Sequence, residues 1–244
     1  MSRTLHIATL NIHKGVMGFN ARMSLHRQRD LIRRTHADIV FLQEVCGKQT
    51  QRQHLDTQHE FLADSIWQDF AYGKNAITAA GHHGNAILSK FPISKWENED
   101  ISAHRTEQRG MLHCEIAIPD WAQPLHCICV HLGLFSHWRS RQLLALRERI
   151  EALVPSDAPL IIAGDFNDWR MRAGHILQQG LHLREVFEHS VGKPARSYPA
   201  ILPMFRLDRI YTRGFHIQHS AVHGGGAFSR VSDHAALLAT LTKL

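Results

Sequence analysis

The chain has 244 residues, of which 44% are hydrophobic and 20% are charged. This length suits one large α/β or all-β domain, so we expect a single folding unit over residues 1–244. With only 16 glycines and 8 prolines, and no long charge block, the composition excludes a disordered or fibrous chain. The net charge of +6 and the 20 histidines indicate an anionic partner, a metal ion, or both.

The sequence shows neither a long apolar span nor the basic-then-apolar start of a secretory signal. We therefore expect a cytoplasmic protein without a transmembrane segment. Its four cysteines, Cys46, Cys114, Cys127 and Cys129, form no C-x-x-C pair and lie in or beside apolar runs. Reduced core thiols are the favoured interpretation, ahead of a metal or redox pair.

Short runs rich in Ile, Val and Leu recur along the chain, and each predicts a strand bounded by turn residues. These runs are 5–12, 38–45, 85–88, 111–118, 125–132, 160–166, 207–211 and 235–241. Helical spacing of apolar residues predicts helices over 22–35, 55–67 and 139–153. In the last of these helices, one apolar stripe is formed by Leu143, Leu146, Ile150 and Leu153. We expect the arginines of this helix to lie mostly off the stripe; they are Arg139, Arg141, Arg147 and Arg149.

The strand runs between residues 85 and 132 follow one another without an intervening helix. This order favours mixed or antiparallel sheets over a regular alternation of parallel strands and helices. No internal repeat, low-complexity stretch or linker interrupts the chain. We therefore expect one layered α/β domain.

Polar side chains stand where the predicted strands end. They are Asn11, Glu44, Asp165, Asn167, Asp208 and the triplet Ser232-Asp233-His234. Each one alone is explained by a turn, a cap or a solvated strand end. Together they are harder to explain in this way, because carboxylates without a basic neighbour repel one another unless a cation lies among them.

An ordered set of motifs contains these residues. The set is Thr-Leu-Asn-Ile (9–12), Gln-Glu (43–44), Gly-Asn-Ala-Ile-Leu-Ser (84–89), Arg-Gly (109–110), His-Leu (131–132), Gly-Asp-Phe-Asn (164–167), Leu-Asp-Arg-Ile (207–210) and Ser-Asp-His (232–234). In this order they resemble the endonuclease/exonuclease/phosphatase superfamily, which includes deoxyribonucleases, abasic-site endonucleases, neutral sphingomyelinases and inositol-polyphosphate phosphatases. The resemblance implies a four-layered α/β sandwich, in which two mixed β-sheets pack face to face between helices. It also implies an active site at one edge of the sandwich.

The resemblance further implies a divalent metal, Mg²⁺ or Mn²⁺. Glu44 would be its principal ligand, and Asn11 and Asp233 would lie near the ion or hold its waters; such oxygen ligands suit both ions. Asp165 would orient and deprotonate the attacking water. Asn167 would hold that water or a phosphate oxygen.

The remaining implied roles concern the phosphate. His234 would contact the scissile phosphate, and Asp208 would accept the other ring N–H of that histidine. Arg109 and His131 would bind the non-bridging oxygens. We find no convincing glutamate partner for His131 upstream of Gly84. The resemblance therefore implies that His131 donates a hydrogen bond to the phosphate and is not a strong general acid. A buried histidine with its hydrogen bonds satisfied is the alternative. The implied reaction is in-line hydrolysis without a covalent intermediate.

Two further groups of histidines lie outside the catalytic motifs. His82 and His83 could line the entrance of the site, but a solvated loop is the favoured interpretation. His216, His219 and His223 lie close together without a recognised zinc spacing, so we expect them at the surface.

Basic and aromatic residues are interleaved in residues 193–213, which are one candidate rim of the substrate groove, and residues 135–139, after His131, are a second. From these segments and the motifs we expect substrate contacts by Asn85, Trp138, Arg206 and Phe205. Such a rim suits nucleic acid with unstacked bases and equally an anionic phospholipid headgroup, although a solvated face with a core Phe205 is the simpler alternative.

Three functions stay open. The favoured one is a nuclease acting on DNA or RNA, as a monomeric metal-dependent phosphodiesterase. The next is a phosphodiesterase or phosphatase acting on a phospholipid or a small phosphoester. The last is a catalytically silent protein that binds nucleic acid or another anion. Every expected catalytic position holds a competent residue, which a silent protein has no chemical need to keep.

Overall fold

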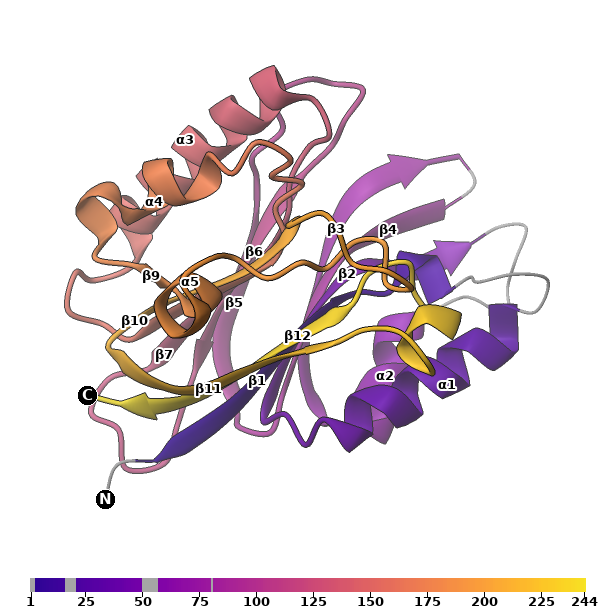
Figure 1. The fold of residues 1–244 in the computed structure, drawn as a ribbon, viewed down its shortest axis with the longest axis horizontal. Helices are drawn as coiled ribbons and strands as arrows, with labels where there is room; N and C mark the ends of the chain where they lie inside the picture. Colours follow the sequence, from indigo (N-terminus) through magenta and orange to yellow (C-terminus); the bar gives the residue numbers. More distant parts are fainter. Residues whose placement is uncertain (1–2, 16–20, 50–56, 80) are drawn as a thin grey trace.

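The computed structural model describes residues 3–15, 21–49, 57–79 and 81–244, and shows two β-sheets packed face to face between helices (Figure 1). The first sheet has the order β11 (Phe215–His223), β12 (Ala236–Lys243), β1 (Thr4–Asn11), β2 (Ile39–Gln49), β4 (Gly81–Ser89) and β3 (Asp69–Thr78). The second has the order β5 (Ile93–Asp100), β6 (Gly110–Ile116), β7 (Leu125–His131), β8 (Leu160–Asp165), β10 (Asp208–Arg213) and β9 (Arg184–Glu185).

Both sheets are mixed. In the first, β1 and β2 pair in parallel, and in the second, β7 and β8 do so, whereas the other neighbouring strands run antiparallel. The helices are α1 (Ala21–Arg34), α2 (Gln58–Ser65), α3 (Ser136–Leu153), α4 (Ala173–Leu181) and α5 (Val186–Val191), with 3-10 turns η1 (His13–Gly15) and η3 (Phe228–Arg230). The expected α/β sandwich is thereby confirmed.

The eight predicted strands are all present, as β1, β2, β4, β6, β7, β8, β10 and β12. The four strands that were not predicted, β3, β5, β9 and β11, are the edges of the two sheets. An edge strand has one neighbour only, and much of its surface faces water. Its sequence is therefore more polar than that of an interior strand. In β5, for example, every residue is exposed or half-buried.

The predicted helices correspond to α1, α2 and α3, while α4 and α5 were not predicted. The predicted helix 55–67 begins at residues 55 and 56, which lie outside the described residues. Arg139 was expected off the apolar stripe of α3 but is 4% exposed. Its guanidinium donates hydrogen bonds to the carbonyl oxygens of Gly133 at 3.0 Å and Leu134 at 2.9 Å, so burial is compensated by partners in the preceding loop.

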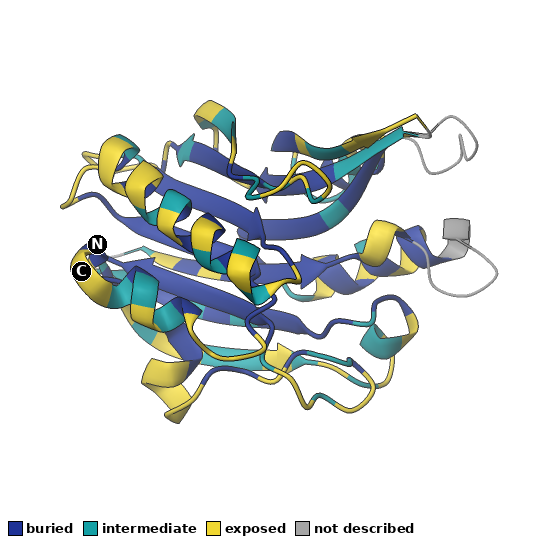
Figure 2. Cartoon of the chain, turned by 90° about the horizontal axis from the view of Figure 1, so that it is seen from above, coloured by how far each residue is buried: buried dark blue, intermediate teal, exposed yellow. Residues whose placement is uncertain are grey.

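Three apolar layers hold the sandwich together. The largest lies between the two sheets, and its members come from both, as the buried strands at the centre of Figure 2 show. A second layer joins β7 and β8 to α3 and α4, and a third joins β1 and β2 to α1 and α2. Cys114, Cys127 and Cys129 lie as free thiols in the layer between the sheets, and burial raises the pKa of Cys129 to about 12.

None of the helices in the described ranges is both long enough and apolar enough to cross a membrane.

A pair of buried histidines joins β6 to β7. His113 Nε2 and His126 Nδ1 are 2.9 Å apart, and one ring donates to the other only while the pair is not fully protonated. Burial, and then the proximity of His113, lowers the pKa of His126 to about 4 from its ordinary 6.5. The unfolded chain therefore binds more protons, so this contribution to stability is complete above pH 6.5 and is lost as the pH falls toward 4.

We predict that His126→Gln, which cannot be protonated, reduces the acid sensitivity of the fold. Between pH 7.5 and 4.5 the free energy of unfolding should fall by about 2 kcal/mol less in this variant than in the wild type. Urea unfolding at the two pH values measures the difference. His219→Gln, at an exposed position of β11, is the matched control and should behave as the wild type. Equal acid sensitivity of the two variants would contradict the prediction.

Candidate active site

The register of the sheets brings the predicted residues to one end of the sandwich. Asn11 ends β1 and His131 ends β7, and each of these strands pairs in parallel with a neighbour that carries another site residue near the same end. His131 pairs with Asp165 at the end of β8. Asp165 in turn lies opposite Asp208, because β10 runs antiparallel to β8. Strand pairing therefore collects the side chains within each sheet, and the face-to-face packing of the two sheets brings the two sets together.

A local irregularity directs Glu44 toward this end. The pairing of β2 with β4 shifts register between Leu42 and Val45, and Glu44 has a φ of 56°. A bulge of this kind turns a side chain out of the alternation of the strand. Glu44 is half-buried and lines the same cavity as Asn11.

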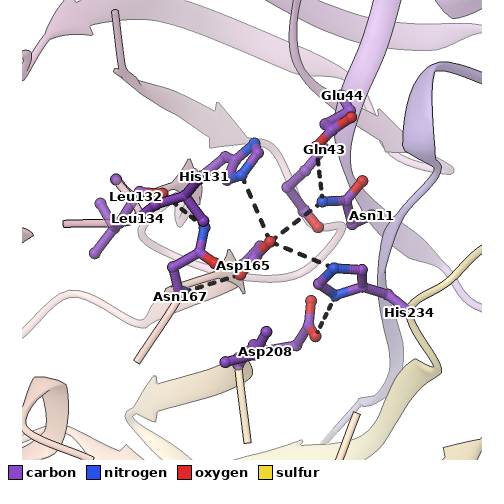
Figure 3. A network of polar contacts seen from close by, with 12 residues as sticks. Asn11, Gln43, Glu44, His131, Leu132, Leu134, Asp165, Asn167, Asp208 and His234 are labelled. Carbon is purple, nitrogen blue, oxygen red and sulfur yellow. Dashed lines mark hydrogen bonds and ion pairs between the residues drawn. The ribbon is translucent and has the colours of Figure 1, made fainter. Parts of the chain in front are cut away.

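Asp208, His234 and Asp165 form the buried centre of the site (Figure 3). His234 Nδ1 lies 2.8 Å from Asp208 Oδ2, and His234 Nε2 lies 3.8 Å from Asp165 Oδ2. Burial by itself lowers the pKa of His234, but the two carboxylates outweigh it and raise this pKa to about 10. The imidazolium therefore supplies positive charge among the carboxylates, a role that the sequence assigned to a metal ion.

Asp165 is held from several sides. Its Oδ1 accepts a hydrogen bond from the backbone N–H of Asn167 at 2.9 Å, and its Oδ2 lies 3.2 Å from Asn11 Nδ2 and 3.5 Å from His131 Nε2 (Figure 3). Burial raises the pKa of Asp165 to about 6, against the opposing effect of His234. A carboxylate with a raised pKa is the stronger base.

His131 stands on the other side of Asp165 from His234 (Figure 3). Burial, followed by the charge of Arg109, lowers the pKa of His131 well below its ordinary value. A neutral ring can donate one hydrogen bond but has no extra proton to give up. This agrees better with a hydrogen-bond donor to the phosphate than with a general acid. The side-chain amide of Asn167 donates to the carbonyl oxygen of Leu132 at 2.9 Å, so the loop after β8 is tied to the loop after β7.

The donors around Glu44 fit a hard divalent cation. Asn11 Nδ2 lies 3.4 Å from Glu44 Oε1, so the amide and the carboxylate share one wall. Asp233 Oδ1 is buried and forms no hydrogen bond, although His13 Nδ1 lies 3.4 Å away. Asp233 and Glu44 line the same cavity, and carboxylate oxygens of this kind are the donors that Mg²⁺ or Mn²⁺ binds.

A different group has the closest set of metal-type ligand atoms among the described residues. Atoms of Asp165, Asp208 and His234 all lie within 4.8 Å of one another. His234 Nδ1 is engaged by Asp208, and a protonated ring has no free nitrogen lone pair for a metal. We therefore interpret this group as a hydrogen-bonded triad and keep Glu44 as the expected ligand.

A cavity of about 210 Å³ opens at this end of the sandwich. The expected residues that line it are Asn11, Glu44, Arg109, His131, Asp165, Asn167, Asp233 and His234. Asp208 is 1% exposed and lies behind His234, where it can act only through that ring. The expected catalytic and metal residues thus come together in one place.

The four expected substrate contacts do not line the cavity. Asn85 is fully buried, and its amide donates to the carbonyl oxygens of Gly110 and Cys129, both at 3.2 Å. It therefore links the first sheet to the second and has no surface for a ligand. The expected substrate contact is wrong because Asn85 lies in the middle of β4, covered by the facing sheet, and not at the start of a strand.

Trp138, Arg206 and Phe205 lie outside the cavity lining. Trp138 stacks on His104 with ring centroids 4.5 Å apart, and Arg206 Nε donates to the carbonyl oxygen of Pro194 at 2.9 Å. Phe205 is 42% exposed and contacts Trp169, which does line the cavity, at a centroid distance of 4.9 Å. Phe205 is therefore neither a core residue nor a direct wall of the cavity.

Five residues that were not assigned to the site line the cavity. They are His13, Leu134, Trp169, Tyr198 and Leu207. Leu134 and Trp169 each follow a strand that carries a catalytic position, so a systematic reading of the loops after residues 131 and 165 would have found them. Tyr198, whose ring lies 5.0 Å from that of His234, comes from a segment with no strand or helix signal.

Glu107 was also missed. Its Oε1 lies 3.6 Å from Arg109 Nη2 and accepts a hydrogen bond from the backbone N–H of Leu134 at 3.0 Å. It thus holds Arg109 against the loop after β7. Nothing in the local sequence marks this contact, because the two segments meet only in the folded chain.

His82 and His83 are not a solvated loop. Both are half-buried in β4, and His82 Nδ1 lies 3.0 Å from the hydroxyl of Tyr72. Burial, followed by the charge of Lys14, lowers the pKa of His83 to about 4. By contrast, His216 and His219 are exposed on β11, as expected.

The chain matches the endonuclease/exonuclease/phosphatase family over residues 8–234, nearly its whole length. It belongs to the endonuclease/exonuclease/phosphatase family. It is 44% identical over 241 residues to the uncharacterized protein YbhP of Escherichia coli K12, a match that covers 96% of this chain and 95% of the relative. YbhP of Shigella flexneri matches with the same identity and coverage.

Solved structures share the fold at low sequence identity. The endonuclease/exonuclease/phosphatase from Bacteroides vulgatus has a TM-score of 0.79 at 15% identity, covering 99% of this chain and 100% of its own. Truncated TDP2 from Caenorhabditis elegans has a TM-score of 0.75 at 17% identity, covering 98% and 97%. At such identities the likeness shows the fold alone. Members of the superfamily are generally phosphoester hydrolases and typically use divalent metals.

We predict that Asp208→Asn lowers the pKa of His234 by at least about two units, because the neutral amide no longer stabilises the imidazolium while burial still opposes it. A pH titration of the ring nitrogens by NMR measures this shift. Asp157→Asn, which changes an exposed carboxylate away from the cavity, should leave the titration unchanged. A His234 pKa that is the same in Asp208→Asn and the wild type would contradict the assigned triad.

Proposed function

We propose that this chain is a divalent-metal-dependent phosphodiesterase that hydrolyses its substrate by in-line attack of water. The observation that carries the proposal is the position of Asp165. This buried carboxylate faces the cavity between a neutral histidine, His131, and a charged one, His234. Such an arrangement provides a base and two phosphate-binding groups at one point.

Asp165 is the proposed general base. Its Oδ1 is occupied by the backbone N–H of Asn167, which leaves Oδ2 as the oxygen nearest to the histidines. In this proposal Oδ2 accepts the proton of the attacking water, and Asn167 helps to orient that water molecule. The raised pKa of Asp165 favours this transfer at neutral pH.

His234 and Arg109 are the proposed binding groups for the phosphate. Asp208 keeps the His234 imidazolium charged and oriented, so that Nε2 faces the cavity. Arg109, held by Glu107, adds a second fixed positive charge, and neutral His131 adds a hydrogen-bond donor. These groups offset the negative charge that develops on the non-bridging oxygens in the transition state.

Glu44, with Asn11 and Asp233 beside it, is the proposed site for Mg²⁺ or Mn²⁺. Such an ion supplies Lewis-acid polarisation of the phosphate and neutralises charge there. The locally acidic wall of Glu44 and Asp233 would otherwise repel an anionic substrate. The ion therefore reconciles the carboxylates of the cavity with a phosphodiester.

Two substrate classes fit this chemistry. Nucleic acid, the class favoured by the sequence, is supported by Trp169 and Tyr198 at the cavity wall, since aromatic rings can stack on unpaired bases. A phospholipid is supported by the exposed aliphatic side chains close to the same cavity. Both substrates require the same hydrolytic centre.

We predict hydrolysis of bis-p-nitrophenyl phosphate in the presence of Mg²⁺ or Mn²⁺, and its loss on addition of EDTA. Asp165→Asn and His234→Ala should each lower the rate by at least about a hundredfold, as expected for positioned acid-base and phosphate-binding groups. Circular dichroism and thermal unfolding check that the variants fold, and His219→Gln serves as the active control. Near-normal rates in the variants would show that the roles are wrong. Absence of turnover in folded wild-type protein would favour the silent binding protein instead.

We also predict that Glu44→Gln weakens Mn²⁺ binding by at least about tenfold, because a neutral amide replaces the charged donor. Isothermal titration calorimetry measures the affinity without reference to turnover. Glu60→Gln, at an exposed position of α2, removes the same charge elsewhere and should bind Mn²⁺ as the wild type does. Unchanged affinity in Glu44→Gln would place the metal elsewhere.

A further inference from the structure

Exposed apolar side chains gather on three loops near the cavity. Among the described residues, fourteen large hydrophobic side chains are exposed, and eight of them belong to these loops. The eight, which we call the apolar rim, are Leu134, Phe135, Trp169, Met171, Ile201, Leu202, Met204 and Phe205. Such a concentration exceeds the scattered single exposures that are normal on a protein surface, and it indicates an interaction site.

The three loops lie at the catalytic end of the sandwich, on the side of the second sheet. One follows β7, one follows β8, and the third leads into β10, so each adjoins a strand that carries His131, Asp165 or Asp208. Leu134 and Trp169 line the cavity itself. The ring of Trp169 contacts that of Phe205, which joins the second loop to the third. The apolar rim therefore borders the mouth of the cavity.

The most exposed part of the apolar rim is held in place by its backbone. Tyr198 and Phe205 bridge the base of the third loop through backbone hydrogen bonds in both directions, at 2.8 and 3.2 Å. The N–H of Ala200 donates to the carbonyl oxygen of Asp233 at 2.6 Å. Ile201, beyond these anchors, is 76% exposed. A fixed loop that keeps aliphatic groups in water is unfavourable unless a partner covers them.

The charges on the same loops are complementary to an anionic surface. In residues 133–141, 167–176 and 192–207 the lone carboxylate, Asp168, is 2% exposed and pairs with Arg209 at 3.3 Å. The basic residues of these segments that are exposed or half-buried are Arg141, Arg170, Arg172, Lys193, Arg196 and Arg206. Within these three segments, the apolar rim is therefore accompanied by positive charge and by no exposed carboxylate.

We propose that the apolar rim docks on the surface of an anionic phospholipid bilayer. Ile201, Leu202 and their neighbours enter the boundary between headgroups and acyl chains, and the arginines and lysine bind the headgroup phosphates. The docked protein then presents the cavity to headgroup phosphoesters, a consequence that rests on the proposed hydrolytic function. Trp169, with its apolar ring and polar N–H, is of the residue type that is enriched at membrane interfaces.

The composition of the apolar rim favours lipid over nucleic acid. Leu134, Met171, Ile201, Leu202 and Met204 are aliphatic or thioether side chains. They have no ring on which a base can stack, and they would gain little beside a hydrated sugar-phosphate backbone. Insertion among acyl chains removes them from water. The same arginines serve either partner, so the aliphatic side chains decide between them.

Co-sedimentation with vesicles tests the docking. The wild type should bind phosphatidylglycerol/phosphatidylcholine vesicles at least ten times more tightly than Ile201→Asp/Leu202→Asp does. Leu144→Asp/Val191→Asp, which adds the same charge at exposed apolar positions of α3 and α5, should bind as the wild type. Vesicles of phosphatidylcholine alone should bind the wild type more weakly. No binding to the anionic vesicles, or equal binding by the two double variants, would overturn the proposal.

A second measurement separates this proposal from the hydrolytic one. Turnover of soluble bis-p-nitrophenyl phosphate should be the same in the wild type and in Ile201→Asp/Leu202→Asp, because neither residue lines the cavity. Vesicle binding without any turnover would refute the proposed hydrolysis and leave the docking intact. If Ile201→Asp/Leu202→Asp instead weakens single-stranded DNA binding tenfold while vesicles do not bind, the apolar rim belongs to a nucleic-acid surface and the lipid proposal is wrong.

Discussion

The hydrogen bond between Asp208 and His234 is the interaction on which the candidate site depends. Both groups are almost completely buried, where a lone charge of either sign would be strongly disfavoured. Their pairing makes burial possible and keeps the imidazolium charged beside Asp165. A second carboxylate can then be buried within 4 Å of the ring and still face the cavity. The proposed base and the proposed phosphate-binding group are thus a single electrostatic unit.

The sandwich supplies the geometry for this unit through two parallel pairs of strands. Parallel pairing of β1 with β2 and of β7 with β8 places strand ends side by side, and antiparallel β10 brings Asp208 back to Asp165. Side chains on paired strands have little freedom to separate, because backbone hydrogen bonds maintain the register. The loops that leave these ends are less constrained by the core. They carry the aromatic and aliphatic groups of the apolar rim.

Sequence patterns predicted the interior of each sheet and missed its edges. Interior strands such as β7 are buried on both faces, so their apolar runs stand out, whereas every residue of the edge strand β5 is exposed or half-buried. Arg139 and Asn85 were misplaced for a related reason. A charged or amide side chain reads as a surface or ligand group, yet both are buried here with backbone carbonyl partners contributed by other segments. Such partners are invisible in local sequence.

The sequence by itself indicated a layered α/β domain through the periodicity of its strands, and the resemblance of its ordered motifs to a known family implied the sandwich and the residues of the expected catalytic centre. It could not determine the charge state of His234, the support of Arg109 by Glu107, or the position of the apolar rim beside the cavity. Each of these depends on contacts between segments that are distant along the chain and on which side chains remain exposed after packing. Burial and proximity set the charge of His234 and the pairing of Arg109, and packing sets which apolar side chains stay exposed. Only the tertiary structure therefore decided these three features.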